Sequence, residues 1–281
     1  MSRRVPSWWI ALGGALLALS PSSAQAVEPV DVELVLAVDV SLSMSPAELE
    51  IQRRGYAAAL THDTVLQAIA DGAYGRIAVT YVEWAGTTTQ RVVVPWTAIS
   101  DRADAERVVA GMSARPPGSA RRTSISAALE FAGDLFAESG FKGMKRVVDI
   151  SGDGPNNQGG PVAAVRDRLV GEGITINGLP LMTTGGYASI FDVPDLDRYY
   201  SDCVIGGPGA FMVPVNDWPQ FPEAVRRKLV MELAGPGSPR RSAEVAAQPP
   251  VLLAADGPAV DCLVGEKMWR NRTWMYDDGN R

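Results

Sequence analysis

Residues 32–43 have the sequence VELVLAVDVSLS, and this stretch determines the fold class that we expect. The run from Val32 to Asp39 is nearly all apolar and rich in valine, which is typical of a central strand buried on both faces of a sheet. Asp39, Ser41 and Ser43 then alternate with apolar residues at the carboxyl end of this run. This spacing places their oxygen atoms on one side of the turn that leaves the strand.

An alternation of strands and helices follows. Further strands are expected at residues 76–84, 91–99, 145–150, 174–180 and 210–214, and helices at 46–69, 101–112, 124–139, 161–172 and 217–233. Pro95 cannot donate to a ladder, so the strand that contains it is expected at an edge of the sheet. A polar loop is expected at Asp195–Tyr200. The alternation predicts an α/β fold, with a doubly wound, mostly parallel central sheet flanked by helices and functional loops at the carboxyl ends of the strands.

The start of the chain predicts export. Residues 1–26 have the features of a secretory signal peptide: arginines at the start, a short apolar run, and Ala24-Gln25-Ala26 just before the expected cleavage site. The apolar run is shorter than the roughly 20 residues that cross a bilayer, so no stable membrane anchor is expected after cleavage. We therefore expect a periplasmic or extracellular protein.

The rest of the chain divides by composition. An α/β domain is expected at 27–234, a Pro/Gly/Ala-rich linker at 235–260 and an aromatic tail at 261–281. Because export leads to an oxidising compartment, Cys203 and Cys262 are expected to form a disulfide that ties the tail back to the domain. Two buried free thiols are the alternative.

Composition and charge exclude several classes of function. With 46% hydrophobic and 21% charged residues, the 281-residue chain has the composition of a globular protein. Its net charge of −6 does not favour binding to nucleic acid. His62 is the single histidine in the sequence, which excludes a histidine-rich metal site and argues against a Ser-His-Asp triad.

Oxygen donors occur in three segments that we expect to meet at one edge of the sheet. The first is the Asp39–Ser43 turn, the second carries Thr123 just before a helix, and the third is Ser151-Gly152-Asp153-Gly154 after a strand. Together they supply hard oxygen donors without sulfur or imidazole, which suits Mg²⁺ or Mn²⁺. Each segment also has a simpler interpretation, because serine and threonine cap helices and Asp-Gly forms turns.

The combination DVSLS, Thr123 and SGDG on an α/β alternation resembles the von Willebrand factor A (vWA) domain and its metal-ion-dependent adhesion site. The resemblance covers about residues 30–234. The wider sequences RTSISAALEFA, VVDISGDGPNNQGG and YYSDCVIGGPGAF resemble a bacterial exported subgroup, the DUF1194 family.

The resemblance implies a role for each donor. Ser41, Ser43 and Thr123 would coordinate the metal through their hydroxyls, while Asp39 and Asp153 would hold it mainly through bound waters. An exposed Asp or Glu of a protein partner would take the remaining position, because a cation with few direct carboxylates keeps charge to attract an anion.

Two arginines are expected at the rim of this site, in addition to its hydroxyls and carboxylates. Arg121 and Arg122 directly precede Thr123, where they either steer an acidic ligand or are simply solvated.

Three functions fit these observations. The favoured one is a non-enzymatic, metal-dependent module that binds a protein. A secreted metal-dependent hydrolase is a second, although the chain lacks a G-x-S-x-G elbow and such sites use richer sets of direct ligands. The third is a metal-free scaffold that binds through Trp269, Trp274 and Tyr276 of the tail; packing of these aromatics on their own domain is the simpler interpretation.

Overall fold

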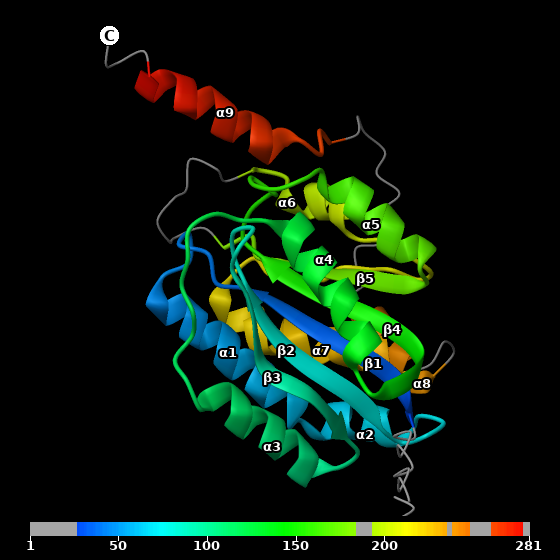
Figure 1. The fold of residues 1–281 in the computed structure, drawn as a ribbon. Helices are drawn as coiled ribbons and strands as arrows, with labels where there is room; N and C mark the ends of the chain where they lie inside the picture. The colour runs from blue at the N-terminus through cyan, green and yellow to red at the C-terminus, as the bar shows by residue number, and fades with distance from the viewer. Residues whose placement is uncertain (1–26, 184–192, 235–237, 248–259, 278–281) are drawn as a thin grey trace, which may run out of the picture.

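The structure is a computed structural model that describes residues 27–183, 193–234, 238–247 and 260–277 (Figure 1). Within these segments a five-stranded sheet has the order β3-β2-β1-β4-β5. The strands are β1 (Glu28–Asp39), β2 (Ile77–Trp84), β3 (Gln90–Ile99), β4 (Phe141–Gly152) and β5 (Ile174–Pro180). All pairs are parallel except β2 and β3. The predicted doubly wound, mostly parallel α/β sheet is therefore confirmed.

The position of each strand follows from its sequence. β1 lies at the centre, and every residue from Val30 to Asp39 is buried, as its apolar run predicts. β3 is the antiparallel edge strand. Its Pro95 is exposed and lies opposite a register shift between Val79 and Tyr81 of β2, so the missing amide proton interrupts no regular ladder.

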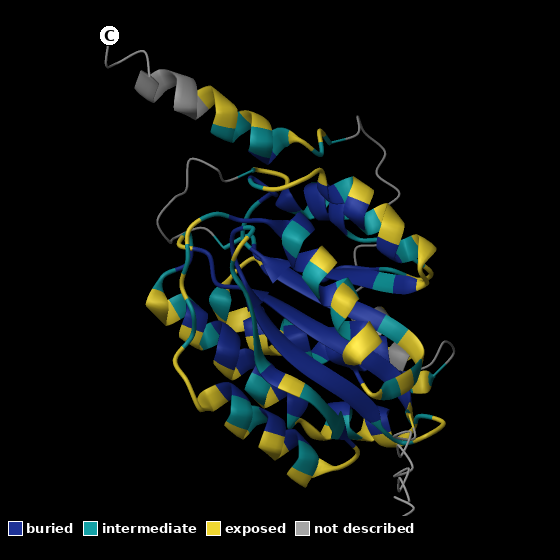
Figure 2. Cartoon of the chain, viewed as in Figure 1, coloured by how far each residue is buried: buried dark blue, intermediate teal, exposed yellow. Residues whose placement is uncertain are grey.

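Helices cover both faces of the sheet; β2 and nearly all of β1 are buried between them, whereas the edge strand β3 is mostly half-buried (Figure 2). On one face lie α1 (Pro46–Leu60), α2 (Asp63–Ala70), α3 (Arg102–Ser113) and α7 (Phe221–Leu233); on the other lie α4 (Ile125–Leu135), α5 (Val162–Gly171) and α6 (Leu196–Tyr199). Successive side chains of β1 pack alternately against the helices on the two faces of the sheet. Leu34 and Leu36 join the first hydrophobic core, whereas Val35 and Ala37 join the second.

The expected helix over 46–69 is two helices, so that prediction was wrong. α1 ends at Leu60, and α2 starts at Asp63. His62 has extended backbone and its Nδ1 accepts a hydrogen bond from the Thr64 amide at 3.2 Å, so it caps α2. Hydrophobic periodicity continues through the break, which is why the pattern alone did not reveal it.

Two further predictions beyond β5 were wrong. The segment expected to be a polar loop, Asp195–Tyr200, contains α6, and a π-helical turn continues it over Tyr200–Val204. Residues 210–214, expected as a strand, make only isolated bridges beside β5. The Phe211 amide donates to the Asn177 side chain, and Pro180 of β5 has no amide proton to donate to this segment, so the ladder is interrupted.

Helices also occur in the C-terminal part of the chain. α8 (Pro239–Ala247) lies within the expected linker, and α9 (Val264–Asp277) within the expected aromatic tail. The expected signal peptide, residues 1–26, lies outside the described residues. Among the helices that the structure describes, none combines the length and hydropathy needed to cross a membrane.

Candidate metal centre

The centre of the candidate site is the carboxyl end of β1. The Val40 amide donates to the Trp84 carbonyl at 2.8 Å, so the pairing with β2 continues one residue beyond Asp39 before the chain turns. The Ser41 amide then donates to Asp39 Oδ1 at 2.7 Å. This local hydrogen bond forms the turn, and it fixes the Asp39 carboxylate over the edge of the sheet.

The loop after β4 approaches this turn. Ser41 Oγ lies 2.8 Å from Ser43 Oγ, and Ser43 Oγ donates to Asp153 Oδ1 at 2.8 Å. The approach follows from the parallel pairing of β1 with β4, which ends both strands at the same edge. The structure thus brings both serines and Asp153 together.

Thr123 joins the group through its backbone. Its amide donates to Asn157 Oδ1 at 3.0 Å, and its carbonyl accepts from the Asn157 amide at 2.8 Å, which ties it to the loop that carries Asp153. On the other side, the Leu42 amide donates to the Ala120 carbonyl at 2.9 Å. The three expected segments are therefore linked to one another.

Asp39 has an electrostatic environment that favours a bound cation. Its Oδ2 is buried, and among the described residues no hydrogen-bond partner reaches it. Burial raises the pKa of Asp39 well above its usual value, and the Asp153 carboxylate raises it further. A cation between the two carboxylates would offset both effects, since it stabilises their ionised forms.

The donor set fits a hard divalent cation. Within the described residues, no group of three or more His, Cys, Asp or Glu side chains is placed to hold a metal. The candidate centre has a different composition, in which hydroxyls accompany a pair of carboxylates. These hard oxygens suit Mg²⁺ or Mn²⁺, which keep bound waters and need few direct carboxylates.

Tyr200 lies beneath the site and was not expected there. A Cβ at Gly152 would lie 2.8 Å from Tyr200 Oη and 3.0 Å from Asp39 Oδ2, so glycine leaves space between these two oxygens. The Tyr200 hydroxyl is buried and has no hydrogen-bond partner among the described residues. Burial, followed by the charges of Asp39 and Asp153, raises its pKa well above the usual value. The sequence pointed to a loop here; Tyr200 belongs to the family-like stretch YYSDCVIGGPGAF, but nothing in that stretch linked the tyrosine to the metal site.

The two rim arginines differ in their surroundings. Arg121 is exposed, so it remains available to an acidic ligand. Arg122 is half-buried, and its guanidinium carbon lies 3.1 Å from the centroid of the Trp269 ring. Trp269 thus packs on its own domain. The side chains of Trp274 and Tyr276 lie outside the described residues.

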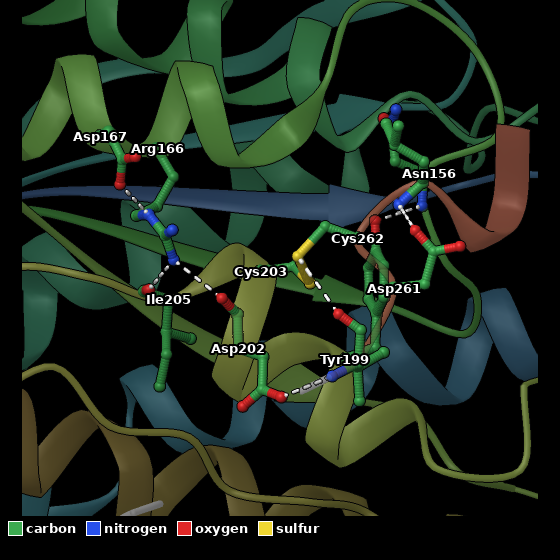
Figure 3. Close-up of a disulfide and its surroundings, with 11 residues drawn as sticks. Asn156, Arg166, Asp167, Tyr199, Asp202, Cys203, Ile205, Asp261 and Cys262 are labelled. Carbon is green, nitrogen blue, oxygen red and sulfur yellow. Dashed lines mark hydrogen bonds and ion pairs between the residues drawn. A yellow bond between two sulfur atoms is a disulfide. The ribbon is translucent and has the colours of Figure 1, made fainter. Parts of the chain in front are cut away.

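Cys203 and Cys262 form a disulfide, with their Cα atoms 5.5 Å apart (Figure 3). Cys203 belongs to the π-helical turn after α6 and is buried, while Cys262 lies just before α9. The described residues contain no free cysteine.

A family model described as "Protein of unknown function (DUF1194)" matches residues 29–237. The chain belongs to the DUF1194 family. The match includes the whole candidate metal centre and Cys203, and it ends before α9. No curated protein matches the sequence at a significant level.

Solved structures similar to this DUF1194 chain have the same kind of fold. One is proximal thread matrix protein 1 from the mussel byssus with a zinc-occupied MIDAS motif, at 16% identity and TM-score 0.55, covering 74% of this chain and 48% of that one. Another is the pilus adhesin SpaC from Lactobacillus rhamnosus GG, at 13% identity and TM-score 0.51, covering 74% and 31%. The DUF1194 chain thus spans about half the length of the mussel protein.

A von Willebrand factor type A structure from Catenulispora acidiphila is also similar, at 18% identity and TM-score 0.48, covering 73% of this chain and 43% of that one. The fold of the DUF1194 domain is vWA-like.

Proposed function

We propose that this domain is an exported, non-enzymatic binding module that holds Mg²⁺ and uses it to capture an acidic side chain of a protein partner. Mn²⁺ is the alternative ion. The residues that would hold the metal are Asp39, Ser41, Ser43, Thr123 and Asp153. The metal, when bound, supplies an electrophilic position for a partner's Asp or Glu.

The main support for this proposal is Asp39 Oδ2, which is buried beside the hydrogen-bonded serines and Asp153 and has no hydrogen-bond partner in the part of the chain that the structure describes. A buried carboxylate oxygen without a donor is costly, and a cation removes that cost. The MIDAS motif of the mussel protein, occupied by zinc on a similar fold, supports a metal at this edge of the sheet.

The exposed residues around the candidate centre support the proposal that its ligand is a protein. Leu42, in the middle of the DVSLS turn, has 53% of its surface exposed, and Arg121 is exposed nearby. An apolar side chain and a positive charge beside a cation suit an acidic protein segment with apolar neighbours. We therefore assign steering of the partner to Arg121, since Arg122 stacks on Trp269.

Two observations support export and a non-enzymatic role. The Cys203–Cys262 disulfide is typical of proteins outside the reducing cytosol. The candidate centre has one pair of carboxylates accompanied by hydroxyls: Asp39 is the last residue of β1, and Asp153 directly follows β4. Metal-dependent hydrolases generally use more direct carboxylate or histidine ligands.

The test is affinity capture from an envelope extract of a bacterium that encodes the chain, with Mg²⁺ and again with EDTA. Wild type and Ser43→Ala serve as bait, and Ser45→Ala, which removes only the cap of α1, is the matched control. We expect one partner to be retained by wild type and Ser45→Ala in Mg²⁺, and lost with EDTA or Ser43→Ala. An identical set of partners in all conditions would favour a metal-free scaffold, and turnover of a phosphoester substrate would favour the hydrolase.

A further inference from the structure

We propose that α9 is a tethered latch that holds the two loops carrying Thr123 and Asp153 in their metal-binding arrangement. The expected effect of this latch on metal affinity rests on the proposed function. The latch itself is a property of the metal-free protein. It concerns the part of the chain that lies beyond the family match.

The start of the latch is anchored to the core. The disulfide joins Cys262 to the buried Cys203, and the Val260 amide donates to Asp202 Oδ2 at 3.0 Å (Figure 3). These bonds fix the residues just before α9 to the π-helical turn. They limit how far α9 can move from the carboxyl edge of the sheet, where it lies in Figure 1.

The first turn of α9 contacts the loop that carries Asp153. Glu266 Oε1 accepts a hydrogen bond from Asn156 Nδ2 at 2.7 Å. Gly265 lies so close that a Cβ would be 2.2 Å from the Asn156 carbonyl oxygen. Asn156 is fully buried, and its Oδ1 accepts from the Ser126 amide at 3.0 Å, so it connects α9 with the start of α4.

The next turn of α9 contacts the loop that carries Thr123. The Trp269 ring lies against the guanidinium of Arg122, 3.1 Å from its central carbon. Arg122 has a φ of 76°, a left-handed conformation that a residue with a Cβ seldom adopts. The stacking interaction helps to hold this unfavourable backbone one residue before Thr123.

The latch therefore joins two loops that are already paired with each other. Thr123 and Asn157 exchange two hydrogen bonds, and α9 contacts the residue before each of them. Loosening α9 should loosen this pair, and with it the positions of Thr123 and Asp153.

α9 contributes little to the hydrophobic core. Among the residues of α9 whose burial the structure describes, only Gly265 is buried, and the others are half-buried or exposed (Figure 2). A substitution on α9 is thus expected to leave folding intact. Its effects should appear in the loops that α9 contacts.

The first arm of the test measures amide hydrogen exchange in the metal-free protein. Trp269→Ala removes the stacking interaction, and Gly265→Ala pushes α9 away from Asn156; the exposed Arg270→Ala is the matched control on the same helix. We expect exchange in residues 120–124 and 154–158 to be about fivefold faster in the first two variants, from the size of one cation–π contact. Exchange equal to wild type in both would overturn the latch.

The second arm measures Mg²⁺ affinity by calorimetry on the same proteins. We expect about tenfold weaker binding for Trp269→Ala and Gly265→Ala, as for the loss of an outer-shell partner, and wild-type binding for Arg270→Ala. Faster exchange with unchanged Mg²⁺ affinity would overturn the positioning role. If wild type binds no Mg²⁺, the proposed function fails, and the exchange comparison still decides whether α9 holds the loops.

Discussion

Ser43 Oγ donates a hydrogen bond to Asp153 Oδ1 at 2.8 Å, although the two residues are 110 positions apart in the chain. Ser43 follows β1 and Asp153 follows β4, and these strands are parallel neighbours at the centre of the sheet. The contact is thus a direct result of the topology. It places a hydroxyl and a carboxylate from separate loops within reach of one cation.

Tyr200→Phe should separate the role of this tyrosine in metal binding from its role in folding. The hydroxyl lies buried near Asp39 without a partner among the described residues, so its removal should not lower the free energy of unfolding of the metal-free protein. If it donates to the hydrated metal site, Mg²⁺ affinity should fall by about tenfold. Chemical unfolding and calorimetry measure the two quantities. A variant that loses stability but keeps full Mg²⁺ affinity would contradict this role.

The sequence predicted the fold and the convergence of the oxygen donors for one reason. Apolar runs identify strands, and the parallel order brings their carboxyl ends to one edge, so Asp39 and Asp153 were expected to approach each other. Tyr200 was missed because its segment lacks hydrophobic periodicity and was expected to be a loop. The contact between Arg122 and Trp269 was missed because a long-range stacking interaction leaves no local pattern. The break at His62 was missed because apolar residues keep helical spacing across it.

Asp149→Asn should change how stability depends on pH. Asp149 is fully buried on β4, and Lys228 Nζ lies 2.5 Å from Asp149 Oδ1 and 2.5 Å from Glu232 Oε1. Burial raises the pKa of Asp149 to about 7; the Lys228 charge opposes this shift and Glu232 adds to it. In the unfolded chain the pKa of aspartate is about 4.

Between these two pKa values, folded wild type keeps a proton that the unfolded chain has lost, so its stability falls as pH rises towards 7. Asparagine cannot titrate and lacks this dependence. Urea unfolding at about pH 5 and about pH 7.5 should show that the advantage of wild type over Asp149→Asn shrinks by about 2 kcal/mol. A difference that stays constant, or grows with pH, would contradict this assignment.

Removal of the disulfide should destabilise the folded chain. The bridge joins cysteines 59 positions apart, and a crosslink of that length restricts the unfolded ensemble. The Cys203→Ser, Cys262→Ser double variant should lose about 4 kcal/mol of unfolding free energy in the simple chain-entropy model. Reduced wild type is the matched control and should behave like the double variant. Equal stability of oxidised wild type and the double variant would show that the bridge does not contribute.

Calorimetric titration of the wild-type chain and of Asp39→Ala with Mg²⁺ tests the central claim most directly. Melting temperatures of both metal-free proteins are measured first, so that a loss of binding is not mistaken for unfolding. We predict saturable Mg²⁺ binding by wild type and binding weakened by about a hundredfold in a folded Asp39→Ala. Equal Mg²⁺ affinity in the two proteins, or no binding by either, would contradict the account.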